Sequence, residues 1–107
     1  MDQDINRLLL ELERSMRKIN REVINPQIRE VSIDDLHPLL SLVAGARARY
    51  LKALFDLGAN VQDGKPSGTQ LDDLARLRRE YEELVSGAKA LETAIQRGYL
   101  DVQHGRR

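Results

Sequence analysis

The sequence predicts an all-α protein: a three-helix bundle in up-down-up order, with helices over residues 4–24, 33–57 and 70–97. In two stretches, apolar residues alternate at spacings of three and four positions, which places them on one side of a helix. One set is Ile5, Leu9, Leu12, Met16, Ile19 and Val23; the other is Leu74, Leu77, Tyr81, Leu84, Ala88, Leu91 and Ile95. The hydrophobic fraction is 41% and the aromatic fraction only 4%, which suits an aliphatic helical core.

The first helix is expected to begin at Asp4, whose carboxylate can accept hydrogen bonds from the first backbone amides. It should end before Asn25-Pro26, because proline disfavours helical geometry in the residue before it. Leu8 and Leu10 flank the apolar set, so apolar side chains cover most of the helix circumference at this end. They need a second neighbour in the same bundle or a partner protein. We expect the bundle, since compact domains bury such faces internally.

The second helix should follow Ser32, which forms a capping box pattern with Asp35. Pro38 is tolerated only in a first turn, so either the helix begins later than residue 33 or it bends at His37-Pro38. Gly58 is the expected terminator. This helix has the widest apolar surface and should be central.

The third helix should start at a capping box formed by Thr69 and Asp72 and end at Arg97, with Gly98 closing it. A loop rich in glycine and proline precedes it. Mid-helix Gly87 indicates close helix packing, because glycine is unfavourable there by about 1 kcal/mol relative to alanine. Residues 99–107 are mostly polar and are expected to fray, unless Tyr99 and Leu100 pack back.

Composition limits the function classes. A chain of 107 residues is expected to form one domain over 1–107. Seventeen basic and seventeen acidic side chains cancel, so the overall attraction that most nucleic-acid binders use is missing. There is no cysteine, and hence no disulfide or thiolate metal site. With no signal-like start and no membrane-length apolar run, we expect a cytoplasmic protein without membrane contact.

The sequence offers little for catalysis, so we expect no enzyme activity, no catalytic residues, no metal and no cofactor. Asp34 and His37 are three positions apart and could supply four ligands across a twofold dimer. A histidine near a helix start, beside a capping carboxylate, explains the same pair more simply. The serines lack the accompanying features of an activated nucleophile.

Arg47 interrupts the expected apolar seam of the second helix, which otherwise runs through Leu36, Leu40, Val43, Tyr50, Leu54 and Leu57. In an antiparallel hairpin of the second and third helices, Arg47 comes level with Glu80. Two interpretations remain open: a buried ion pair that fixes the register, or an arginine that lays its stem on the core and extends its head to solvent.

These observations together predict a non-catalytic protein–protein interaction or accessory protein that acts through apolar, coiled-coil-like helix faces and assembles into a homodimeric helical bundle. The candidate binding residues are Leu8, Leu10, Leu39, Leu42 and Arg47. The alternative is nucleic-acid or anionic-ligand binding through arginine patches. These patches consist of Arg14, Arg17, Lys18 and Arg21, or of Arg76, Arg78 and Arg79. Glutamates interleave both patches, which favours a solvated charged face.

Overall fold

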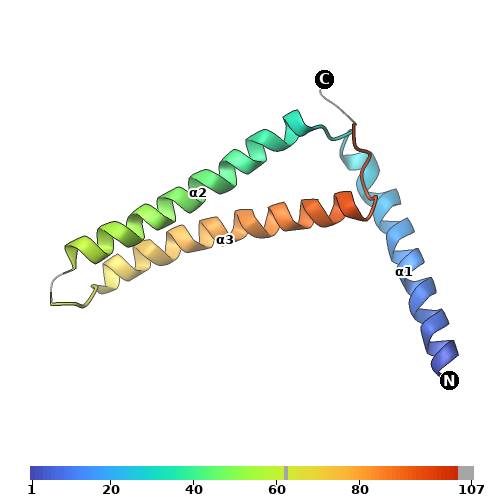
Figure 1. Ribbon diagram of the computed structural model, residues 1–107, viewed down its shortest axis with the longest axis horizontal. Helices are drawn as coiled ribbons and strands as arrows, with labels where there is room; N and C mark the ends of the chain where they lie inside the picture. Colours follow the sequence, from blue (N-terminus) through green and yellow to red (C-terminus); the bar gives the residue numbers. More distant parts are fainter. Residues whose placement is uncertain (62, 104–107) are drawn as a thin grey trace. The chain divides into compact units, whose positions relative to one another are not determined.

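The computed structural model describes residues 1–61 and 63–103 and confirms the all-α class (Figure 1). The elements are α1 (Asp2–Ile24), the 3-10 helix η1 (Asn25–Gln27), α2 (Ile33–Asn60) and α3 (Gly68–Gln96). Within the described ranges the only β-type pairing is an isolated parallel bridge between Val31 and Val102. The three predicted helices therefore exist, with boundaries that differ at several ends.

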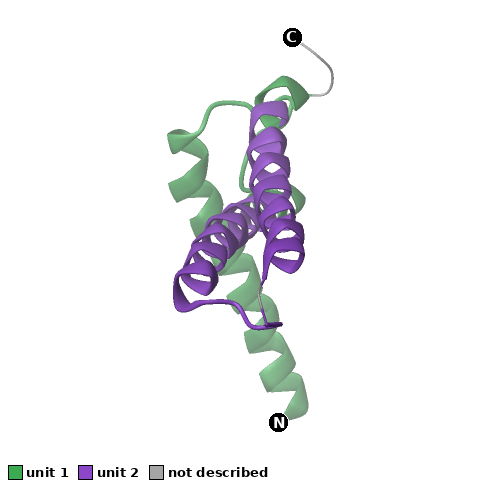
Figure 2. Ribbon diagram, turned by 90° about the vertical axis from the view of Figure 1, so that its left-hand side faces the viewer, with its two compact units in different colours: residues 1–36, 91–107 green, residues 37–90 purple. Residues whose placement is uncertain are grey.

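The chain divides into two compact units, coloured separately in Figure 2. Unit 1 contains residues 1–36 and 91–107, and unit 2 contains residues 37–90. Unit 1 therefore holds α1, η1, the first residues of α2 and the end of α3, whereas unit 2 holds most of α2 and α3.

Unit 2 is a helical hairpin in which α2 and α3 pack in opposite directions (Figure 1). The residues of the predicted α3 apolar set that lie in this unit, from Leu74 to Ala88, are all half-buried, as are Leu91 and Ile95 in unit 1. On α2 the half-buried or buried positions in this unit include Val43, Ala46, Tyr50, Ala53 and Leu57. The seam of α2 therefore passes through Ala46. The prediction that it passes through position 47 is wrong.

The start of α2 confirms the predicted pairing of Ser32 with Asp35. The Asp35 carboxylate accepts hydrogen bonds from the Ser32 backbone N–H at 2.9 Å and from its hydroxyl at 3.1 Å. The helix does not begin later, because it is continuous from Ile33 to Asn60 and includes Pro38. Proline at this sixth position removes one backbone donor near the helix start.

The prediction that Gly58 ends α2 is wrong, since the helix continues to Asn60. The Asn60 side-chain amide donates to the Asp56 carbonyl at 2.7 Å at this end of the helix. The left-handed residues lie beyond the helix instead, at Asp63 with φ 58° and Gly64 with φ 68°.

The predicted capping box at Thr69 and Asp72 is also wrong, because the actual box lies two residues earlier. The Ser67 hydroxyl accepts from the Gln70 N–H at 3.1 Å, and the Gln70 side-chain oxygen accepts from the Ser67 N–H at 2.8 Å. Serine followed three positions later by glutamine satisfies the same rule, and this reciprocal pair starts α3 at Gly68.

The C-terminus of α3 is closed by Gly98, as predicted. Gly98 has φ 74°; its N–H donates to the Ile95 carbonyl at 3.2 Å, and the Tyr99 N–H donates to the Ala94 carbonyl at 2.9 Å. This pair of bonds is the Schellman motif, which satisfies helix-end carbonyls by placing a left-handed residue just after the helix.

At its start α1 departs from the prediction, because the helix begins at Asp2 and Asp4 lies inside the first turn. Carboxylates in a first turn favour the helix dipole without acting as the cap. Its end at Ile24 is as predicted, but Asn25 keeps helical geometry with φ −53° and ψ −46°, so the chain continues into η1. A following proline disfavours this conformation without forbidding it.

The described part of unit 1 has a small core formed where residues 99–102 return to the segment before α2. Val31, Ser32, Tyr99 and Leu100 are buried. The Val31 N–H donates to the Asp101 carbonyl at 2.9 Å, and the Gln103 N–H donates to the Val31 carbonyl at 2.8 Å. Residues 99–103 are therefore packed back, and the expected fraying does not apply to them.

Substitution by alanine should change stability in opposite directions at two glycines of the α3 region. At Gly98 the left-handed backbone makes Gly98→Ala unfavourable by about 1 kcal/mol. At Gly87, in the interior of α3, alanine has the better helix propensity and should stabilise by up to about 1 kcal/mol. An added Cβ meets nothing within 4 Å at either position, so the close helix packing predicted at Gly87 is wrong, and packing does not disturb the comparison. Thermal unfolding at one fixed protein concentration measures both, and a loss of stability in Gly87→Ala would show that the close packing inferred from the sequence exists.

Candidate interaction surfaces

An exposed apolar surface of unit 1 lies on α1. We call it the α1 stripe and define it as Ile5, Leu9, Leu12, Met16, Ile19 and Val23. These side chains are 45–61% exposed, and α1 contributes no buried residue. We expected neighbours within the bundle to cover this set, and the structure does not show that burial. A regular apolar set left in solvent on a 23-residue helix is typical of a surface that binds another helix.

The two candidate leucines beside the α1 stripe lie on different sides of it. At about 100° of rotation per residue, Leu8 sits about 60° from the centre of the stripe and Leu10 about 140° from it. Leu8 is 67% exposed and Leu10 is 57% exposed. Leu8 therefore forms the edge of the stripe, whereas Leu10 lies on the opposite face.

Charge is unevenly distributed along α1. Residues 2–13 carry four acidic side chains and one basic one, whereas residues 14–24 carry four basic side chains and one acidic one. We call these segments the acidic half and the basic half. Two ion pairs lie along the helix, Arg17–Glu13 at 3.3 Å and Lys18–Glu22 at 3.9 Å. All four of these side chains are more than half exposed, so each pair adds little stability.

A second exposed set lies on α2 and consists of Leu40, Ala44, Arg47, Leu51 and Leu54, which we call the α2 flank. Its spacings again alternate between four and three, beside the seam that faces α3. The candidate residues Leu39 and Leu42 are exposed near the start of the same helix. Phe55 is 77% exposed, and the sequence analysis did not single it out. The sequence signal that could have identified it is a phenylalanine directly beside the leucines of this helix.

Arg47 is exposed and belongs to the α2 flank, so the buried ion pair with Glu80 is wrong. Its Nε donates to the Tyr81 hydroxyl at 3.2 Å, and its guanidinium carbon lies 5.4 Å from the centre of the Tyr81 ring. Tyr81 in turn stacks on Tyr50, with ring centroids 6.1 Å apart. Glu80 pairs with Arg49 at 2.7 Å instead. The predicted hairpin register thus holds to within about two residues, and the exposed-head interpretation of Arg47 is supported.

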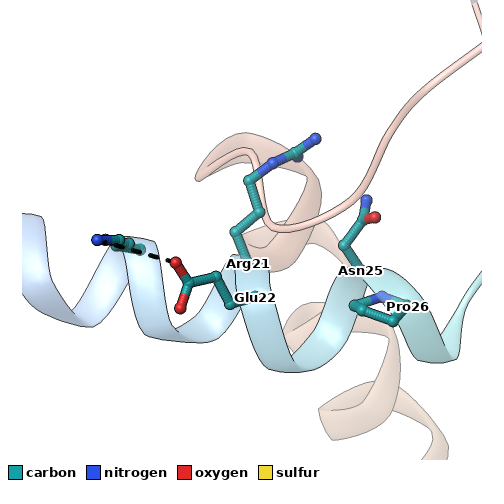
Figure 3. Close-up of a pocket in the computed structure, with 5 residues that line it drawn as sticks. Arg21, Glu22, Asn25 and Pro26 are labelled. Atoms are coloured by element: carbon teal, nitrogen blue, oxygen red, sulfur yellow. Dashed lines mark ion pairs between the residues drawn. The ribbon is translucent and has the colours of Figure 1, made fainter.

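The basic residue Arg21 ties the end of α1 to the turn after α3 within unit 1. Its guanidinium donates to the Gly98 carbonyl at 2.8 Å and to the Asp101 carboxylate at 2.7 Å. We call these two interactions the Arg21 clasp. Arg21 lies about 160° from the centre of the α1 stripe, so the clasp lies on the polar face of the helix. Figure 3 shows Arg21 and Asn25 pointing to one side of α1, away from Glu22.

Beside the clasp is a shallow cavity of about 350 Å³, lined by Lys18, Arg21, Glu22, Asn25 and Pro26 (Figure 3). Its two cations are already paired, Lys18 with Glu22 and Arg21 with Asp101. On α3, Arg78 similarly pairs with Glu82 at 3.8 Å. These pairings weaken the alternative of an anion-binding or nucleic-acid-binding patch, because a phosphate would have to displace a carboxylate at each of them.

Across residues 1–61 and 63–103, no group of three or more histidine, cysteine, aspartate or glutamate side chains could hold a metal ion. Nor does any helix in these ranges have the length and apolarity needed to cross a membrane.

The clasp has a pH signature. Hydrogen bonds from Arg21, and then from Asn25, lower the pKa of the Asp101 carboxyl below its ordinary value of 3.8. A carboxylate whose pKa is lowered by folding stabilises the fold above its unfolded pKa, and this contribution disappears as the pH falls through the folded pKa. We expect Arg21→Met to return the Asp101 pKa towards its ordinary value in a carboxyl NMR titration. Arg14→Met, which removes the same charge from the same face of α1, should leave it unchanged.

Substitution by leucine should change the free energy of unfolding differently at the neighbouring residues Ala46 and Arg47. Ala46 is 2% exposed in the seam, so Ala46→Leu overpacks the hairpin and should cost about 1–3 kcal/mol of unfolding free energy. Arg47→Leu removes an exposed cation–π contact and an exposed hydrogen bond to the Tyr81 hydroxyl, and should change stability by less than about 1 kcal/mol. Chemical denaturation measures both. A loss of about 3 kcal/mol or more in Arg47→Leu would restore the buried-pair interpretation.

Comparison with family models, with curated proteins and with solved structures gave no significant match.

Proposed function

We propose that this protein is a non-catalytic assembly protein that acts through apolar helix faces and forms a homodimer through the α1 stripe. The observation that carries the proposal is the exposure of all six stripe residues on one continuous helix. Their alternating spacing matches the positions that a coiled coil or helical bundle buries. Burying them would complete the helical core that the sequence predicts.

The energetics favour an occupant for this surface. Fully burying a leucine-sized side chain contributes about 1.5–3 kcal/mol, and the stripe residues are only about half covered. With Leu8 included, two such surfaces would bury on the order of 1,000 Å², the lower limit for a specific protein interface. An association of moderate affinity is therefore expected.

Unit 2 supports the same mode of action. The α2 flank presents Leu40, Leu51 and Leu54 in solvent around Arg47, and the described part of this unit has a single buried residue, Ala46. Both units thus combine a modest interior with an exposed helical face. This combination is more typical of a protein that associates with other helices than of one that encloses a substrate.

The proposal is tested by truncating two adjacent leucines of α1. Leu9 belongs to the stripe and Leu10 to the opposite face, and they are 55% and 57% exposed. In Leu9→Ala each dimer loses two partly buried side chains, or about 2–3 kcal/mol, so the dimer Kd should rise about 30- to 150-fold. Leu10→Ala should leave the Kd unchanged. Sedimentation equilibrium over a range of concentrations measures both.

Alanine favours helix formation, so neither variant should lose helix, and far-UV circular dichroism verifies this. The proposed dimer is contradicted if the unsubstituted protein sediments as a monomer at every concentration. It is also contradicted if the two variants weaken association equally, because the stripe would then not be the contact surface.

A further inference from the structure

We infer that the α2 flank is a docking surface for an amphipathic helix of a different protein, and that this helix carries a carboxylate at the centre of its apolar face. The inference goes beyond the proposed homodimer, because it concerns a second surface and a second partner. It is carried by the position of Arg47 on the flank and by the contacts that hold its guanidinium.

The charge of Arg47 lies at the middle of an apolar surface. At about 100° of rotation per residue, Arg47 is within about 20° of the centre of the α2 flank. Along the helix, two apolar residues of the flank precede it and two follow it. Every other aspartate, glutamate, lysine and arginine of α2 lies about 120° or more from that centre. A helix laid on the flank therefore covers one charge, and that charge is central.

The Arg47 guanidinium is held in place by two tyrosines. Its Nε donates to the Tyr81 hydroxyl at 3.2 Å, and its carbon lies 5.4 Å from the centre of the Tyr81 ring, which stacks on Tyr50. Within residues 1–61 and 63–103, its two terminal nitrogens have neither a hydrogen-bond acceptor nor a carboxylate at ion-pair distance. The nitrogens that can form paired hydrogen bonds with a carboxylate are thus already positioned for one.

Arg49 provides a comparison on the same helix. It lies about 180° from the centre of the α2 flank and pairs with Glu80 at 2.7 Å. Its charge is therefore compensated within the hairpin. The charge of Arg47, among leucines, is compensated by no carboxylate of the described residues.

These features specify the partner. The exposed leucines of the flank match a helix with apolar side chains at alternating spacings of three and four. Burying Arg47 beneath that helix without a carboxylate would leave a desolvated charge unpaired, so the partner has to supply one. A second copy does not, because the same flank would oppose Arg47 with Arg47 and the α1 stripe has no carboxylate among its six positions. A nucleic acid is disfavoured, since one cation among leucines cannot neutralise a run of phosphates.

The test uses three synthetic peptides of about 18 residues, long enough to span the flank as a helix. Each has leucines at alternating spacings of three and four and neutral residues elsewhere. They differ only at the centre of the leucine face, which carries glutamate, glutamine or lysine. Fluorescence anisotropy of each labelled peptide, titrated with the whole chain, measures the Kd. The glutamate peptide should bind about 10- to 100-fold more tightly than the glutamine peptide, and the lysine peptide most weakly.

Two charge-swap variants assign this preference to Arg47. In Arg47→Glu the order of affinities should reverse, so that the lysine peptide binds most tightly. Arg49→Glu makes the same change of charge on the opposite side of α2 and should keep the original order. Far-UV circular dichroism verifies that both variants keep their helix content.

Two leucines of α2 locate the apolar part of the contact. Leu40 lies at the centre of the flank and Leu42 about 160° from it, and they are 57% and 54% exposed. Leu40→Ala should weaken binding of the glutamate peptide about 5-fold, whereas Leu42→Ala should leave its Kd unchanged. Leu9→Ala, in the α1 stripe, should also leave it unchanged.

Equal Kd values for the three peptides would show that the flank does not distinguish charge and would overturn the inference. A loss of affinity in Leu42→Ala or Leu9→Ala as large as that in Leu40→Ala would place the peptide elsewhere and overturn it too. So would the absence of binding by the glutamate peptide at protein concentrations up to about 1 mM. None of these results concerns the homodimer, which sedimentation equilibrium measures separately.

Discussion

An amphipathic helix is stable only when something covers its apolar side, and this constraint organises the whole chain. In unit 2, α2 and α3 cover each other's apolar sides along a seam that includes Ala46, Tyr50 and Tyr81. Ala46 is buried, and the two tyrosines are half-buried. In unit 1, α1 has the same alternating pattern, yet its stripe remains about half exposed. The pattern that makes α1 a helix is therefore also the reason to expect a partner for it.

The C-terminal segment determines which face of α1 remains open. Residues 99–102 return to Val31 through two backbone hydrogen bonds, and Arg21 binds Gly98 and Asp101 from the polar side of the helix. Gly98 closes the last turn of α3, and its own carbonyl accepts a hydrogen bond from the Arg21 guanidinium. A local helix-end motif thus holds the returning segment away from the apolar stripe.

The periodicity of apolar residues predicted the features that follow from the apolar face of a single helix. It gave the three helices, the α3 seam and the hairpin register to within about two residues. It failed where two residues satisfy the same local rule, as at Ser67 against Thr69, and where the helix continues past a glycine, as at Gly58. It also merged the two apolar sets of α2 into one, which placed exposed Arg47 in the seam instead of Ala46. The clasp joins positions 77 and 80 residues apart, which spacing along the chain cannot indicate.

The two exposed faces are not equivalent, and Arg47 is the reason. The α1 stripe has no charged side chain among its six positions, whereas the α2 flank has Arg47 at its centre, held against Tyr81 by a hydrogen bond and a cation–π contact. Burying that guanidinium in a symmetric contact would place two cations close together and desolvate both. Arg47 therefore disfavours the α2 flank as a self-association surface and leaves the α1 stripe as the better one.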